Sequence, residues 1–169
     1  MEVIMININL VNQIYSVDLE INCYGDEHAR PAISLKGAEG SLYEYEPIAR
    51  ATVNIPEFNE GMRRFGAFSN LNEMDDRTFT NERIITEDHP WTFIKDYSEN
   101  QGMLQQLVDN GIVEDLYTKV ACGFSYADLV LIQDKDLVAQ WEEQKAAVDK
   151  KRAMETYRSI VTSINESHK

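Results

Sequence analysis

TFIKDYSENQGMLQQLVDNGIV (residues 92–113) is the one stretch whose beginning, middle and end can all be predicted from residue types. Residues 92–94 predict the end of a half-buried strand. Ser98 is expected to be the N-cap of a helix over residues 99–110, because Gln101 follows three residues later, at the spacing of a capping box. The stretch therefore predicts a strand followed at once by a short, capped helix.

The middle and the C-terminal end of this helix can also be predicted from the residue types. Four apolar residues share one helical face and are expected to pack on a core: Met103, Leu104, Leu107 and Val108. Asn110-Gly111 is expected to end the helix, because glycine adopts the left-handed C′ conformation without a Cβ clash. Ile112 is then expected to fold back as the apolar contact of this C-cap.

Strands are predicted on the N-terminal side of this unit. Alternation of apolar and polar side chains is clearest from Tyr15 to Cys23, and it predicts a strand with one buried face. The four predicted strands cover residues 5–10, 14–23, 32–36 and 48–55. Pro56 is expected to close the fourth strand. Short polar connections between these strands favour an antiparallel meander over a parallel sheet.

The remaining segments complete an α+β prediction. They are an aromatic-rich insertion at residues 57–81 with a short helix at 59–65, a strand at 83–86, a closing hairpin of residues 117–124 and 127–133 around Gly123, and a long helix over 134–165. We therefore expect an α+β fold, with an antiparallel β-sheet meander, one short capped helix packed on it, the insertion, and the long C-terminal helix. Residues 1–133 are predicted to form one acidic domain, and residues 134–169 the helix.

The charge is uneven along the chain. The net charge is −13, and residues 1–133 hold 22 acidic and 9 basic residues. A body this acidic repels phosphates, so no direct binding of nucleic acid is expected. The acidic residues fit either a solvated surface or a surface that attracts a basic protein partner, including a basic nucleic-acid-binding protein.

Other classes of protein receive little support. No run of 18 apolar residues occurs, so no membrane span is predicted. Cys23 and Cys122 are expected to be reduced thiols in a cytoplasmic protein, because two cysteines without a CxxC pair do not make a disulfide framework or a metal motif. His28, His89 and His168 share no ligand spacing, so no metal, cofactor or catalytic residue is predicted.

A weak ligand site is considered at the start of the central helix. Lys95, Glu99 and Asn100 flank this point, where free backbone N–H groups favour an anion. The competing interpretation is purely structural: the cap is already satisfied and Lys95 pairs with a nearby carboxylate.

The C-terminal helix carries a stronger candidate surface. Trp141 and Val148 are expected to pack on the body, whereas the part after the basic cluster at residues 150–152 is expected to project. Its apolar stripe is the predicted partner-binding surface: Tyr157, Ile160, Val161 and Ile164. Such a stripe fits a homodimer, a groove on another protein or packing back on its own body.

Three short segments carry a resemblance to a known family. They are ATVNIP (51–56), FIKDYSENQGM (93–103) and ACGF (121–124). In this order they resemble an uncharacterised family of small proteins from plasmids, conjugative elements and phages of Gram-positive bacteria. The resemblance covers roughly residues 14–131, and it implies a genomic setting without implying an activity. The insertion at 57–81 and the long C-terminal helix depart from the family pattern.

Two functions are expected from these observations. The first is a non-enzymatic, protein-binding accessory factor of a mobile element or phage, with inhibition of a CRISPR or restriction system as its most concrete form. The alternative is a small-ligand-binding or catalytic domain with its site near the N-terminus of the helix at 99–110. A pocket with convergent polar groups at that point would favour the alternative.

Overall fold

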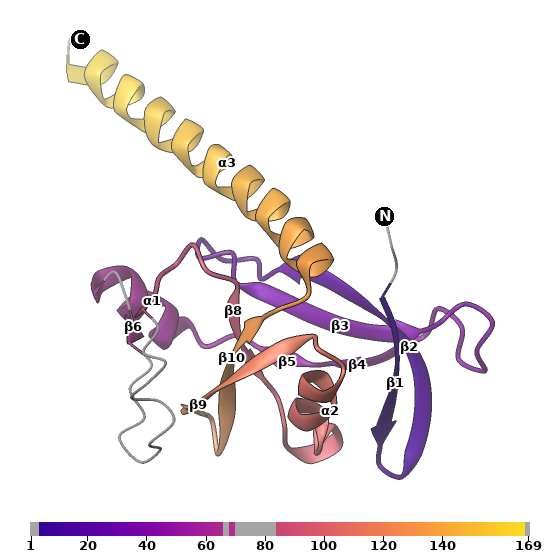
Figure 1. The fold of residues 1–169 in the computed structure, drawn as a ribbon. Helices are drawn as coiled ribbons and strands as arrows, with labels where there is room; N and C mark the ends of the chain where they lie inside the picture. Colours follow the sequence, from indigo (N-terminus) through magenta and orange to yellow (C-terminus); the bar gives the residue numbers. More distant parts are fainter. Residues whose placement is uncertain (1–3, 66–67, 70–83, 168–169) are drawn as a thin grey trace.

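Two four-stranded antiparallel sheets form the body of the protein, and a long helix leaves it (Figure 1). The computed structural model describes residues 4–65, 68–69 and 84–167. The strands are β1 Ile4–Leu10, β2 Gln13–Cys23, β3 Pro31–Gly37, β4 Pro47–Arg50, β5 Thr52–Val53, β6 Phe68–Ser69, β7 Ile84–Ile85, β8 Trp91–Ile94, β9 Val113–Cys122 and β10 Ser125–Ile132. The helices are α1 Pro56–Phe65, the 3₁₀ turn η1 Ser98–Asn100, α2 Met103–Asp109 and α3 Lys135–Ser167. The predicted α+β class is confirmed.

The first sheet is the predicted meander, with strand order β1-β2-β3-β4. Its inner strand β2 buries Val17, Leu19 and Ile21 and exposes Glu20 and Asn22, as the alternation predicts. Asp18, on the predicted polar face, is an exception because it is also buried. The second sheet has the order β5-β8-β10-β9, and β9 and β10 form the predicted closing hairpin. The short strands β6 and β7 pair only with each other.

The prediction of one continuous strand over residues 48–55 is wrong. The chain passes from the first sheet to the second at Ala51, which is fully buried. The Ala51 N–H donates to the carbonyl of Ile33 in β3 at 2.9 Å, and its own carbonyl accepts from the N–H of Lys95, just after β8, at 2.8 Å. Ala51 is therefore hydrogen-bonded to both sheets, and it divides the expected strand into β4 and β5.

Strand β8 is fully buried, so the prediction of a half-buried strand is also wrong. It lies between β5 and β10, and both of its faces are covered. Trp91 and Phe93 belong to one core cluster, beneath α1, and Ile94 belongs to the other, beneath α2 and α3. A strand covered on both faces needs no polar alternation. Thr92 is tolerated because its hydroxyl donates to the carbonyl of Pro31 at 2.7 Å.

The central helix starts later than predicted, and Ser98 does not cap it. Ser98 has a left-handed backbone (φ 55°) at the start of η1, and α2 begins only after Gly102, with φ 92°. The carboxylate of Asp96 instead accepts from the N–H of Leu104 at 3.1 Å. A side chain eight residues upstream thus satisfies one of the free N–H groups that every helix start presents.

The end of α2 is as predicted. Gly111 has φ 70°, its N–H donates to the carbonyl of Val108, and the N–H of Ile112 donates to the carbonyl of Leu107 at 2.9 Å. These two bonds define a Schellman motif. Ile112 is buried in the same core as Met103 and Leu107, so the predicted apolar contact is confirmed.

Helix α1 begins at Pro56, three residues before the predicted short helix. Proline suits the first turn of a helix because the N–H it lacks would be unpaired there. Phe58 and Met62 pack on the second core, and the ring of Phe58 meets those of Trp91 and Phe93 edge-on at 5.4 and 5.1 Å. The rest of the predicted insertion, apart from β6, lies outside the described residues.

Helix α3 is anchored by its first half. Asp134 caps it, accepting from the N–H groups of Asp136 and Leu137 at 3.0 Å. Trp141 is fully buried as predicted, and Val148 is half-buried. The side-chain amide of Gln144 makes two hydrogen bonds to the backbone of β2. Its N–H₂ group donates to the carbonyl of Ile21, and its oxygen accepts from the N–H of Cys23.

The second half of α3 leaves the body. Residues 153–167, called the outer arm from here on, are exposed without exception. Figure 1 shows this arm extending away from both sheets, as the sequence predicted. Among the described residues, no helix combines the length and the apolar character needed to cross a membrane.

Gly37 provides a test of the loop between β3 and β4. A Cβ at this position would lie 1.6 Å from the carbonyl oxygen of Tyr43. Gly37→Ala is therefore expected to lower the free energy of unfolding by about 1–3 kcal/mol or more, as steric overpacking does. Urea denaturation followed by circular dichroism measures this. Gly25→Ala is the matched control, because nothing lies within 4 Å of its added Cβ. Equal stability of the two variants would contradict the close approach at Gly37.

Candidate functional site

The three residues of the predicted ligand site do not converge on one cavity. The ammonium of Lys95 pairs with the carboxylate of Glu99. Asn100 is buried, and its side-chain N–H₂ donates to the carbonyl of Arg50 at 2.7 Å. Lys95 and Glu99 therefore satisfy each other at the surface, whereas Asn100 ties η1 to β4. This arrangement supports the structural interpretation of these residue types.

An open depression of about 690 Å³ lies beside this turn. It is lined by Asn9, Val11, Asn12, Ser98, Glu99, Gln101, Gly102 and Gln106. One side-chain amide in this lining, that of Gln106, is hydrogen-bonded to the backbone of β1. It accepts from the N–H of Asn9 at 2.6 Å and donates to the carbonyl of Asn9 at 2.8 Å. The polar groups here join α2 to β1, and Glu99 is the one predicted ligand residue among them.

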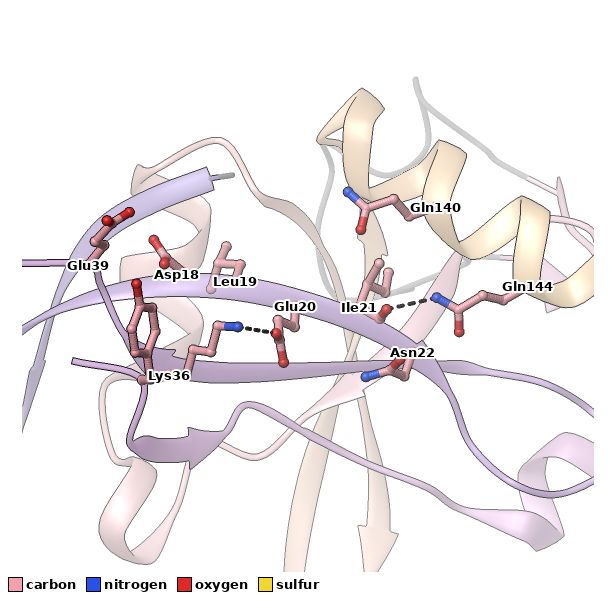
Figure 2. A pocket seen from close by; sticks show the side chains of 10 residues that line it. Asp18, Leu19, Glu20, Ile21, Asn22, Lys36, Glu39, Gln140 and Gln144 are labelled. Atoms are coloured by element: carbon pink, nitrogen blue, oxygen red, sulfur yellow. Dashed lines mark hydrogen bonds and ion pairs between the residues drawn. The ribbon is translucent and has the colours of Figure 1, made fainter. Parts of the chain in front are cut away.

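A second hollow lies between β2 and α3 (Figure 2). It measures about 470 Å³, and Gln140 and Gln144 of α3 face the strand residues across it. Its charged groups are Asp18, Glu20, Lys36 and Glu39, and Lys36 pairs with Glu20. The hollow is polar and acidic, but no side chain in it is arranged as a nucleophile beside a base.

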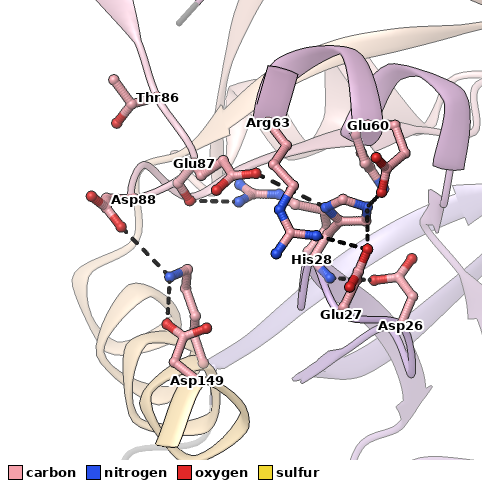
Figure 3. A network of polar contacts seen from close by, with 12 residues as sticks. Asp26, Glu27, His28, Glu60, Arg63, Thr86, Glu87, Asp88 and Asp149 are labelled. Carbon is pink, nitrogen blue, oxygen red and sulfur yellow. Dashed lines mark hydrogen bonds and ion pairs between the residues drawn. The ribbon is translucent and has the colours of Figure 1, made fainter. Parts of the chain in front are cut away.

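The densest group of convergent polar side chains surrounds His28 (Figure 3). The imidazole Nε2 lies 2.8 Å from a carboxylate oxygen of Glu60 and 3.9 Å from one of Glu27, and Nδ1 lies 4.0 Å from Glu87. The His28 side chain is only 6% exposed, whereas the three carboxylates are 42–59% exposed. A buried imidazole thus meets carboxylates at both of its ring nitrogens. We call these four residues the His28 cluster.

Two arginines border the cluster at Glu27. Arg63 of α1 pairs with the Glu27 carboxylate at 2.7 Å, and this hydrogen bond lowers the pKa of Glu27 below its ordinary value. Arg152 of α3 donates to the Glu27 carbonyl at 2.7 Å and lies 3.8 Å from its carboxylate. Glu27 is therefore ionised at neutral pH, and it is the point where the loop after β2 meets both helices.

Hydrogen bonds that link Asp26, Asn54 and Asn59 hold the loop after β2 against α1. The carboxylate of Asp26 accepts from the N–H of His28 at 3.0 Å and from the side chain of Asn54 at 2.7 Å. Asn54 accepts in turn from the side chain of Asn59 at 2.7 Å. Because Asn59 and Glu60 are neighbours on α1, these bonds fix the position of His28 relative to Glu60.

The His28 cluster was missed by sequence reasoning, which expected no metal ligands. Its members come from the loop after β2, from α1 and from the turn before β8, so they share no spacing along the chain. Nδ1 of His89 accepts from the N–H of Thr86 at 2.8 Å, and His89 lies outside the cluster.

The predicted partner-binding stripe is exposed on the outer arm. The exposed fractions are 68% for Tyr157, 54% for Ile160, 37% for Val161 and 52% for Ile164. Met154, which sequence reasoning did not include, is 48% exposed and extends the same face. This stripe is the longest run of exposed apolar side chains on any described helix.

Comparison with known proteins gives no further guide: no family model, no curated protein and no solved structure matches this chain. The resemblance to proteins of mobile elements therefore stays a prediction.

Proposed function

We propose that this protein is a non-enzymatic protein-binding module and that the outer arm of α3 is its contact element. The observation that carries the proposal is the exposed stripe on a helix that no other described element covers. A helix of this kind is stabilised in water mainly by packing of its apolar face. An apolar face without an intramolecular partner is typical of a surface that another chain covers.

A second copy of this chain is the occupant that the stripe fits best. Met154, Tyr157, Val161 and Ile164 follow one another at intervals of three, four and three residues, the spacing of coiled-coil contact positions. This order of intervals is the same in both directions. In an antiparallel pair, Met154 would meet Ile164 and Tyr157 would meet Val161, so the stripe complements itself, as a two-fold interface requires.

Charge and area support the antiparallel arrangement. The basic cluster Lys150, Lys151 and Arg152 lies at the base of the arm, and Glu166 lies near its tip. Antiparallel pairing brings the tip of one arm to the base of the other, which separates the two basic clusters. Covering both stripes would bury roughly 1,000 Å² in total, at the lower end of specific interfaces. Burial of apolar area is favourable by about 25 cal/mol per Å², and the entropy lost on association offsets most of this gain.

The acidic body supports a further partner of opposite charge. Residues 1–133 carry the entire net charge, and a basic nucleic-acid-binding protein complements such a surface. Together with the resemblance to proteins of mobile elements, this makes inhibition of a CRISPR or restriction nuclease the most concrete form of the proposed function. Its test is whether the purified protein prevents cleavage of DNA by such a nuclease.

Light scattering tests the contact element directly. The full chain is expected to be a dimer at about 100 µM, and a chain that ends at Ala153, which keeps the Arg152 contact, is expected to be a monomer. Val161→Asp should also give a monomer, because a charge would be buried at the centre of the pair without a partner. Ser159→Asp is the matched control on the opposite face of the arm, and it should remain a dimer. A monomeric full chain, or a dimer that survives Val161→Asp, would show that the arm does not pair with itself.

A further inference from the structure

The contact between His28 and Glu60 fits either a hydrogen bond or a shared metal ion. A neutral imidazole has one N–H and one lone pair, and a carboxylate only accepts hydrogen bonds. Nε2 of His28 lies 2.8 Å from Glu60, and Nδ1 faces the Glu87 carboxylate at 4.0 Å. If the ring proton is on Nδ1, the lone pair of Nε2 points at an anionic oxygen, which is repulsive. With the ring proton on Nε2 the imidazole donates to Glu60, whereas with the proton on Nδ1 the Nε2 lone pair is available to a metal ion that the carboxylate also binds.

The ligand atoms have the separations that a metal site needs. Nε2 of His28 and one carboxylate oxygen each from Glu27 and Glu60 all lie within 4.8 Å of one another. Ligands at about 2.0–2.2 Å from a shared ion lie roughly 3–4 Å apart in tetrahedral geometry. The distance of 3.9 Å from Nε2 to Glu27 lies in this range, and that of 2.8 Å to Glu60 would lengthen by a few tenths of an ångström to admit the ion.

The position of Glu87 is an independent feature of the same kind. Metal-bound histidines usually turn their second ring nitrogen toward a carboxylate or a carbonyl, which fixes the tautomer and the orientation of the ring. The Glu87 carboxylate lies on that side of the ring, 4.0 Å from Nδ1, a distance that a bridging water would span, and it belongs to a segment separate from both carboxylates at Nε2. Because the imidazole is almost completely buried, it presents Nε2 in one direction only, toward the two exposed carboxylates.

We propose that Glu27, His28 and Glu60 form a binding site for a divalent first-row transition metal ion, with Zn²⁺ as the preferred ion. One imidazole and two carboxylates make a mixed nitrogen and oxygen set, which suits Zn²⁺ and Mn²⁺, whereas Mg²⁺ and Ca²⁺ prefer oxygen alone. Zn²⁺ binds such sets more tightly than Mn²⁺. Glu27 leaves Arg63 to bind the ion, and a water molecule completes four-coordination.

Calorimetric titration of the metal-stripped full chain with Zn²⁺ tests the site. We expect one Zn²⁺ per chain and at least a tenfold loss of affinity in Glu60→Gln and in His28→Gln. Glu60→Gln is the decisive variant, because its side chain is 59% exposed and the change keeps its shape. Glu57→Gln, on the same helix, and His89→Gln are the matched controls and should bind as the parent does.

A second readout tests whether the imidazole of His28 is itself a ligand of the ion. In a ¹⁵N-histidine spectrum, one equivalent of Zn²⁺ is expected to shift the Nε2 resonance of His28 and to leave that of His89 in place. If Zn²⁺ does not bind, or if binding persists in Glu60→Gln, the contact between His28 and Glu60 is a hydrogen bond only and the proposal is wrong. Equal binding of Mg²⁺ would also contradict it, because it would show that the imidazole is not a ligand.

Discussion

Trp141→Ala is expected to lower the free energy of unfolding by about 3–5 kcal/mol, as the loss of a large buried aromatic side chain does. The indole is fully buried in the core cluster that joins the first sheet to α2 and α3. Its N–H donates to the carbonyl of Ala29 at 2.8 Å, and the guanidinium of Arg30 lies 5.2 Å from its ring centre. Removing the ring therefore leaves a cavity, an unpaired carbonyl and a helix without its main anchor.

Urea denaturation followed by circular dichroism measures this loss without relying on tryptophan fluorescence. Trp141→Phe should cost less, because it keeps most of the apolar volume and removes the one hydrogen bond, which contributes about 1 kcal/mol. Ser159→Ala on the opposite face of the outer arm is the control, since Ser159 is exposed, and it should leave the free energy of unfolding nearly unchanged. A Trp141→Ala protein as stable as the Ser159→Ala protein would show that α3 is not held at Trp141.

Arg30→Met is expected to have the second large effect, a loss of at least about 3 kcal/mol. Arg30 is 2% exposed, and its guanidinium donates to the carbonyls of Glu87, His89 and Trp91 at 2.6–2.7 Å. It also lies 3.7 Å above the ring of Trp91. Burial lowers the pKa of Arg30 to about 9, which still leaves it protonated at neutral pH. Methionine is apolar and removes the guanidinium donor from all three carbonyls, of which that of His89 still accepts from the N–H of Trp91 at 2.9 Å.

Arg30→Lys distinguishes charge from geometry. Lysine keeps the positive charge but lacks the planar fork that reaches three carbonyls at once. We expect it to recover only part of the stability that Arg30→Met loses, again by urea denaturation. Arg158→Met on the exposed outer arm is the control for removing a positive charge. If Arg30→Met unfolds at the same urea concentration as this control, the buried guanidinium contributes nothing to the fold.

Features set by neighbouring residues could be predicted from the sequence. The C-cap at Gly111, the hairpin around Gly123 and the long helix α3 each depend on residue types within a few positions, and all three are confirmed. The projection of the outer arm beyond the basic cluster at residues 150–152 was also predicted, and residues 153–167 are exposed.

Features that depend on distant segments could not be predicted. The break at Ala51 exists because two sheets meet there, and alternation within one strand carries no sign of a second sheet. Asp96 caps α2 because Gly102 turns the chain back toward it, which displaced the expected cap at Ser98. The His28 cluster needs α1 to pack beside the loop after β2, so no spacing along the chain indicated it.

Because α3 is anchored only in its first half, a small tilt at the anchor moves the tip of the helix over a large distance. Among the described residues, the last hydrogen bond from the helix to the body runs from Arg152 to the carbonyl of Glu27, and the principal contact is that of Trp141. From Trp141 to Ser167 the helix rises roughly 40 Å, at about 1.5 Å per residue. A tilt of about 10° at Trp141 would thus move the tip by about 7 Å. Force applied to the tip by a bound partner is transmitted through Arg152 to the loop that carries His28, and a shift of that loop is amplified at the tip.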